Sequence, residues 1–134
     1  MSKSKIFSLP VRVYFQDTDA GGVVYHASYL NFMERARTEW LRTHGYSNAG
    51  LMKELGVVFV VRSLKLDYLK PAQLDDMLDV TAQIKDIGRS RISLLQTVRR
   101  GVEVLTEAEV HLVCVSLEGF KPVSVPEVLR AQWK

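Results

Sequence analysis

The feature that most restricts the fold of this chain is one change of hydrophobic period near Gly56. Before it, apolar side chains recur every three to four residues over residues 28–43, which predicts one amphipathic helix. After it, apolar and polar residues alternate along four long stretches with short connections, which predicts antiparallel strands. With an earlier strand expected at residues 11–16, the strands begin near residues 11, 57, 77, 90 and 102. One helix laid on a five-stranded antiparallel sheet, an α+β domain, buries both apolar surfaces.

Residues that commonly begin or end a helix stand at both ends of the predicted helix. Ser28 is expected to be the N-cap, because a serine hydroxyl accepts a hydrogen bond from a backbone N–H of the first turn. Gly45 follows His44 at the place where a residue with positive φ often ends a helix. A second, shorter helix is expected at residues 48–55.

Composition restricts the class of protein without choosing a function. The 134 residues fit one domain, residues 1–134. No apolar run approaches the roughly 20 residues that span a bilayer, so we expect a cytoplasmic protein without membrane insertion. The one cysteine, Cys114, fits a reducing compartment and a buried strand position. The basic residues behind the net charge of +3 are dispersed, so no nucleic-acid partner is expected, and no ligand spacing predicts a metal.

Two carboxylates, Asp17 and Asp19, lie in a glycine-bearing loop just before the predicted helix. A helix start offers unpaired N–H groups and a partial positive charge, which stabilise an oxygen that becomes negative during a reaction. A carboxylate beside them can act as a nucleophile or general base, and Gly21 and Gly22 allow a substrate to approach the backbone. These residues therefore suit acyl transfer, although Asp-Thr-Asp in a turn is more often an Asx-turn or a cap.

The stretch from Val13 to Arg37, with Asp17-Thr18-Asp19 and Gly21-Gly22-Val23-Val24-Tyr25-His26 inside it, resembles the signature of the 4-hydroxybenzoyl-CoA thioesterase-like hotdog family. Within that family it is most similar to the YbgC-type acyl-CoA thioesterases encoded with the bacterial Tol–Pal system. The likeness is dense over residues 11–42, with looser cues at residues 59–62, 68–72 and 74–76. It implies the hotdog fold, one long helix wrapped by a five-stranded antiparallel sheet. It also implies hydrolysis of an acyl-CoA thioester to free acid and CoA, without a cofactor.

The resemblance also assigns roles to individual residues of the loop. Asp19 takes the place of the catalytic carboxylate, either attacking the thioester or activating a water. The oxyanion contact falls to the backbone N–H of His26, and the His26 side chain would line the acyl pocket with Tyr25. Gly22 and Val23 are expected to contact the substrate.

Further expectations lie outside this loop centre. Asp17 is expected to be structural, holding the loop through backbone N–H groups. Arg89 and Arg91 flank Ser90 at a predicted turn, where the family uses basic residues, often from a neighbouring subunit, to hold the phosphates of CoA. A solvated turn explains the two arginines equally well. The resemblance implies a homodimer, commonly paired into a homotetramer.

Two other classes of function stay open at this point. A hotdog dehydratase or hydratase acts on the same thioesters but usually needs a histidine paired with an acidic residue. Because His26 could be that histidine, this class stays open. A non-enzymatic acyl-carrier or membrane-complex adaptor would use the fold as a docking surface. For a thioesterase of lipid metabolism, a short-chain or aromatic acyl group is expected, carried by CoA or possibly by acyl carrier protein.

Overall fold

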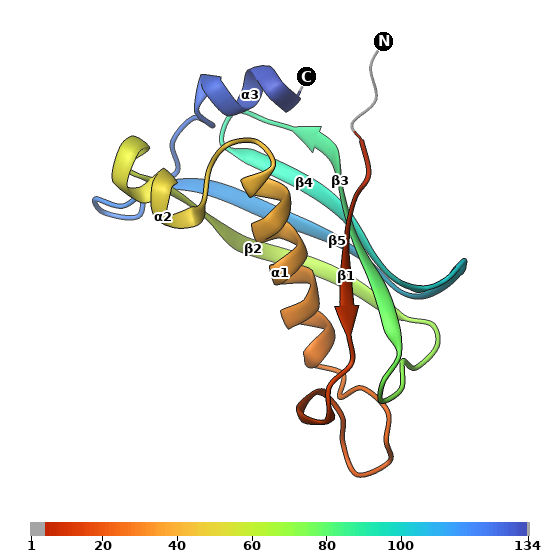
Figure 1. The fold of residues 1–134 in the computed structure, drawn as a ribbon. Helices are drawn as coiled ribbons and strands as arrows, with labels where there is room; N and C mark the ends of the chain where they lie inside the picture. Colours follow the sequence, from red (N-terminus) through yellow and green to blue (C-terminus); the bar gives the residue numbers. More distant parts are fainter. Residues whose placement is uncertain (1–4, 134) are drawn as a thin grey trace.

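The structure is a computed structural model that describes residues 5–133 (Figure 1). One long helix, α1 (Ser28–Arg42), lies against a sheet of five strands. The elements follow along the chain in this order: β1 (Phe7–Arg12), the 3-10 turn η1 (Phe15–Asp17), α1, α2 (Asn48–Gly50), the π-helical turn η2 (Leu51–Leu55), β2 (Val57–Tyr68), β3 (Met77–Ile87), β4 (Arg91–Arg100), β5 (Glu103–Ser116) and α3 (Glu127–Trp133).

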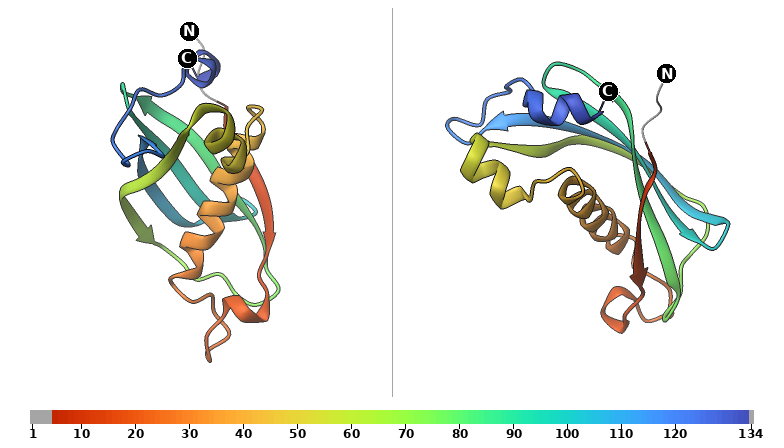
Figure 2. Two further views of the ribbon diagram at one scale, coloured as in Figure 1. Left: turned by 90° about the vertical axis from the view of Figure 1, so that its left-hand side faces the viewer. Right: turned by 45° about the horizontal axis from the view of Figure 1, so that its top comes forward.

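Every pairing in the sheet is antiparallel, and the strand order is β1-β3-β4-β5-β2. The sheet curls around α1, which crosses its concave face (Figure 2). These observations confirm the predicted one-helix, five-strand α+β arrangement. They also place β1 and β2 at the two edges of the sheet.

The apolar stripe of α1 forms the contact with the sheet. Tyr29, Met33, Ala36 and Trp40 are buried as their spacing predicts, and Phe32 joins them. They pack among the inward side chains of β3, β4 and β5, which are mostly aliphatic. Full burial of one large apolar side chain contributes about 1.5–3 kcal/mol, so this contact fixes the helix on the sheet.

Two sequence-based predictions about the first half of the chain are wrong. The first strand is not at residues 11–16 but at Phe7–Arg12, and η1 follows it. Pro10 lies inside β1, where an edge strand tolerates the missing N–H. Ser28 is the first helical residue rather than the N-cap, and its hydroxyl donates to the Asp17 carbonyl oxygen instead.

The remaining helices match the predictions in part. Gly45 adopts a φ of +93° just beyond α1, as expected. The short helix expected at residues 48–55 is present as α2 and η2. Helix α3 was not predicted; Trp133 stacks on Trp40 with ring centroids 5.0 Å apart, so α3 closes one end of the core.

The two edges of the sheet differ in length and in cover. β1 has 6 residues and contains Pro10, both of which discourage further pairing. β2 has 12 residues and, within residues 5–133, pairs only with β5. Its side chains Val61, Leu64 and Tyr68, on the face toward α1, remain 44%, 38% and 49% exposed. The β2 edge therefore combines open backbone groups with uncovered apolar side chains.

Candidate active site

Asp17 shapes the loop that joins η1 to α1. Its buried carboxylate accepts a hydrogen bond from the Tyr14 N–H at 2.8 Å. Its backbone carbonyl accepts two more, from the Tyr25 N–H at 2.9 Å and from the Ser28 hydroxyl at 3.2 Å. These contacts close the loop at both ends, which confirms the structural role expected for Asp17.

Asp19 lies at the exposed tip of this loop. Its Oδ1 accepts the Gly21 N–H at 2.9 Å, which is an Asx-turn. The turn continues with the Gly22 N–H donating to the Asp19 carbonyl at 3.1 Å, and Gly22 takes a φ of +79° that favours glycine. Among the described residues, Oδ2 has no hydrogen-bond partner. The turn thus holds one carboxylate oxygen and leaves the other facing solvent.

The loop is also fastened to the connection between β2 and β3. The Gly22 carbonyl accepts the Leu74 N–H at 3.1 Å, and the Val24 N–H donates to the Ala72 carbonyl at 2.9 Å. Val23 forms an antiparallel bridge with Gln73. Backbone contacts therefore position residues 22–24, although this connection is about 50 residues away in sequence.

His26 presents its backbone N–H away from the helix. The Tyr25 carbonyl accepts the Ser28 N–H at 2.8 Å, and the N–H of the same peptide unit, which belongs to His26, points in the opposite direction. Within residues 5–133 this N–H has no acceptor. The exposed His26 ring lies 4.4 Å from the Tyr25 ring, and no described carboxylate lies within 4 Å of it. The acidic partner that a dehydratase needs is thus not found among the described residues.

Two tyrosines that were not expected to take part in the site hold this region. The Tyr68 hydroxyl donates to the His26 carbonyl at 2.7 Å, and the Tyr29 hydroxyl accepts the Ala72 N–H at 2.9 Å. Burial raises the pKa of both hydroxyls, so they remain protonated at neutral pH. The sequence signal was weak: Tyr68 is the last residue of an alternating strand on the same face as Leu64 and Leu66.

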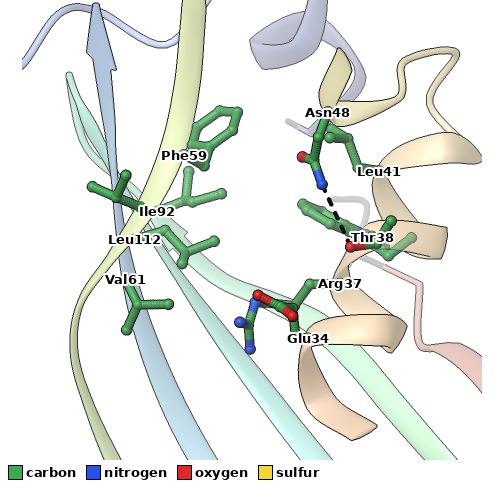
Figure 3. Close-up of a pocket in the computed structure, with 11 residues that line it drawn as sticks. Glu34, Arg37, Thr38, Leu41, Asn48, Phe59, Val61, Ile92 and Leu112 are labelled. Atoms are coloured by element: carbon green, nitrogen blue, oxygen red, sulfur yellow. Dashed lines mark hydrogen bonds between the residues drawn. The ribbon is translucent and has the colours of Figure 1, made fainter. Parts of the chain in front are cut away.

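A pocket of about 300 Å³ opens between α1 and β2 (Figure 3). Its sheet side is apolar and its helix side carries Glu34, Arg37 and Thr38. Neither Asp19 nor His26 lines it. The full lining is Glu34, Arg37, Thr38, Trp40, Leu41, Asn48, Phe59, Val60, Val61, Ile92 and Leu112.

Arg37 is the cationic group of this pocket. Its Nη1 donates to the Gln96 Oε1 at 3.0 Å, and no described carboxylate lies within 4 Å of the guanidinium. Burial lowers the pKa of Arg37, which nevertheless stays charged at neutral pH. Gln96 is fully buried and donates to the carbonyls of Met33 and Thr81, at 3.1 and 3.2 Å. The amide thus ties α1 to the sheet beneath the pocket.

The structure brings the predicted site residues together in two groups, not one. Asp19, Gly22, Val23, Tyr25 and His26 lie around the start of α1, where Tyr68 ends β2. In the second group, Arg89 and Arg91 are exposed at the turn between β3 and β4. Arg91 and Val60 both pair with Val113 of β5, so this turn lies near Val60 along the direction of the strands. Tyr68 lies eight residues after Val60, which corresponds to about 26 Å of strand, so the two groups occupy opposite ends of the sheet.

Other kinds of site receive no support from the described residues. No three His, Cys, Asp or Glu side chains of residues 5–133 come together as metal ligands. Burial raises the pKa of the Cys114 thiol to about 11, as suits the structural role expected for it. None of the helices within residues 5–133 has the length and apolar character to cross a membrane.

Comparison with known proteins relates both the sequence and the fold to thioesterases. The family model of the thioesterase-like superfamily matches residues 13–133. The chain is 46% identical to the acyl-CoA thioesterase YbgC of Haemophilus influenzae over 125 residues, 93% of this chain and 92% of the relative. It is 48% identical to the acyl-CoA thioester hydrolase YbgC of Escherichia coli O6:H1 over 130 residues, 96% of each chain. A probable thioesterase from Bartonella henselae has a crystal structure that superposes with a TM-score of 0.87, at 35% identity, covering 91% of this chain and 100% of that one.

One long helix cradled by a curled antiparallel sheet, with an aspartate-bearing loop at the helix start, defines a hotdog thioesterase. The protein is accordingly an enzyme, a thioester hydrolase. The chain belongs to the thioesterase-like superfamily and, within it, to the family of the YbgC acyl-CoA thioesterases.

Proposed function

We propose that this protein hydrolyses acyl-CoA with Asp19 as its catalytic carboxylate. The observation that supports this most is that one loop holds both Asp19 and the His26 N–H, and that within residues 5–133 the Asp19 Oδ2 has no hydrogen-bond partner and the His26 N–H has no acceptor. The thioester carbonyl would accept the His26 N–H, which stabilises the negative charge that develops on its oxygen. Asp19 would either attack the carbonyl carbon or take a proton from the water that attacks it.

The rest of the reaction demands little from the protein. The C–S bond breaks as the thiolate of CoA leaves, and a solvent proton neutralises it. If Asp19 is the nucleophile, water then hydrolyses the mixed anhydride and regenerates the carboxylate. Both routes give free acid and CoA, and because a thiolate leaves readily, neither needs a strong general acid.

We place the second group of site residues on a partner subunit. A second copy that pairs its β2 with the open β2 edge would cover Val61 and Leu64 and satisfy the open backbone groups. Paired edge strands related by a two-fold axis run antiparallel, so the Tyr68 end of one β2 lies beside the Val57 end of the other. That arrangement brings Asp19 and His26 of one copy close to the pocket of the other copy. It also brings them close to Arg89 and Arg91 of that other copy. A homodimer is therefore the smallest unit with a complete site, and two dimers could form the expected homotetramer.

The pocket suggests the size of the acyl group. A volume of about 300 Å³ is at the small end of ligand pockets, and its sheet wall of Phe59, Val61, Ile92 and Leu112 is apolar. These properties favour a short-chain or aromatic acyl group over a long one. Gly22, Val23 and Tyr25 would contact the thioester end of the substrate. The exposed Arg89 and Arg91 would bind the phosphates of CoA.

The cellular setting is part of the same proposal. We expect the enzyme in the cytoplasm, because its one cysteine is an unpaired thiol. An acyl-CoA substrate would place it in lipid metabolism. CoA is the carrier we expect, and acyl carrier protein is the alternative. An adaptor without activity would bind the same thioesters and leave them intact.

The test is release of free thiol from a panel of thioesters. Acetyl-, butyryl-, benzoyl- and palmitoyl-CoA, together with butyryl-acyl carrier protein, would be compared at equal concentration. We expect kcat/KM to be highest for butyryl- or benzoyl-CoA. Thiol release from none of them would leave the adaptor as the better account, and a preference for palmitoyl-CoA would exclude a site limited to this pocket.

A further inference from the structure

We propose that Tyr68 is a positioning residue that holds the backbone of His26 for catalysis. The inference rests on the proposed function, in which the His26 N–H binds the thioester oxygen. Tyr68 does not touch that N–H. Its hydroxyl donates to the His26 carbonyl, which belongs to the next peptide unit, at 2.7 Å.

The peptide units on both sides of His26 are held by different parts of the fold. The unit before its Cα is fixed from α1, because the Tyr25 carbonyl accepts the Ser28 N–H at 2.8 Å. The unit after its Cα is fixed from the sheet, through the Tyr68 hydroxyl. Since peptide units are rigid planes, only rotation about ψ of Tyr25 and φ of His26 could re-aim this N–H. The Ser28 hydrogen bond holds the plane that carries it, and fixing the plane after the His26 Cα restricts φ of His26.

Tyr68 is itself held firmly enough for this task. As the last residue of β2 it pairs with Thr106, and directly after it the N–H groups of Leu69 and Lys70 both donate to the Leu105 carbonyl, at 2.8 and 3.0 Å. Its ring lies edge-on to Tyr29, with centroids 5.4 Å apart. The Tyr29 hydroxyl is bonded in turn to the Ala72 N–H, next to the segment that bridges Val23.

The hydroxyl of Tyr68 can be removed without removing its ring contacts. The Tyr68 ring is also edge-on to the His26 ring, at 6.5 Å. A phenylalanine would keep both ring contacts and lose only the hydroxyl. Because the His26 N–H would bind most strongly to the charged oxygen of the transition state, looser positioning should lower kcat more than it raises KM.

The experiment compares Tyr68→Phe with Tyr46→Phe, which removes a hydroxyl beyond the opposite end of α1. Both are measured for kcat, KM and melting temperature with butyryl-CoA, and for backbone amide resonances by ¹⁵N–¹H NMR. For Tyr68→Phe we expect a kcat about tenfold lower, since loss of an entire oxyanion donor costs about 10²–10³. KM and melting temperature should stay near wild type, and the His26 and Ala27 amide signals should shift. Tyr46→Phe should match wild type in all four.

Wild-type kcat in Tyr68→Phe, or unmoved His26 and Ala27 signals, would overturn the inference. An equal fall of kcat in Tyr46→Phe would also overturn it, because the effect would then be a general one of losing a hydroxyl. Asp19→Asn is measured in parallel to separate the two proposals. Full activity of Asp19→Asn refutes the proposed function, and the amide signals of Tyr68→Phe still decide whether Tyr68 holds His26.

Discussion

Arg37 on α1 and Gln96 on β4 meet beneath the helix, where the guanidinium Nη1 donates to the amide Oε1 at 3.0 Å. Gln96 is the one hydrogen-bond partner of the guanidinium in the part of the chain that the structure describes. The Gln96 amide also donates to the carbonyls of Met33 and Thr81, so a single fully buried side chain joins α1, β3 and β4.

Replacing Gln96 with leucine should therefore destabilise the fold. Gln96→Leu keeps most of the volume but leaves the Arg37 cation and two carbonyls without this partner. A loss of about 2–4 kcal/mol in the free energy of unfolding is expected, measured by urea denaturation. Leu95→Ala, at a 40% exposed neighbouring position, is the control and should change stability by about 1 kcal/mol or less. Equal stability of Gln96→Leu and wild type would show that the network contributes nothing.

A charge at the uncovered face of β2 should separate the subunits. Val61 is 44% exposed in one copy, so Val61→Lys is compatible with the folded monomer but not with a partner packed on that face. Light scattering at micromolar concentration should give at least a dimer for the wild type and a monomer for Val61→Lys. Val102→Lys, at a 97% exposed hairpin position, should remain assembled. A monomeric wild type would contradict the assembly proposal.

Removing an arginine of the β3–β4 turn should weaken CoA binding. Arg89 and Arg91 are exposed and have no carboxylate within 4 Å among residues 5–133. Phosphates are bound equally in the ground and transition states, so Arg89→Ala or Arg91→Ala should raise KM on the order of tenfold and leave kcat nearly unchanged. Arg99→Ala, on the body of β4, serves as control. Unchanged KM in both variants would mean that other residues hold the phosphates.

The fold was largely predictable because its signals are local. The apolar stripe of α1 and the alternation in β2 to β5 depend only on neighbouring residues, and both are confirmed. The β1 error arose at Pro10, because sequence alone does not show that its missing N–H lies on a sheet edge.

The site was predictable only where one segment carries it. Asp17 and Asp19 belong to a contiguous motif, whereas the Tyr68 contact with His26 joins residues 42 apart. The pocket likewise depends on the side chains that α1 and β2 place opposite each other. Such contacts come from tertiary packing, which no local period encodes.

Cys114 should be unreactive until the protein unfolds. Burial raises the pKa of its thiol to about 11, so the nucleophilic thiolate is almost absent near pH 8. Because the folded pKa lies above the ordinary value of 9.0 for a thiol, the linked stabilisation is complete below about pH 9 and is lost as the pH rises toward 11. A thiol reagent at pH 8 should label the native protein negligibly and find one thiol per chain in denaturant. Rapid labelling of the native protein would contradict the burial of Cys114.

The most direct test of the proposed catalysis is kcat for thiol release from butyryl-CoA by Asp19→Asn. Asparagine keeps the shape and can still accept the Gly21 N–H, but lacks the charge needed to attack a carbonyl or take a proton. Asp17→Asn is the matched variant and should mainly lower the melting temperature, because Asp17 holds the loop. We expect Asp19→Asn to lose kcat by about 10²–10⁴ with an unchanged melting temperature. Wild-type kcat in a folded Asp19→Asn would contradict the catalytic role of Asp19.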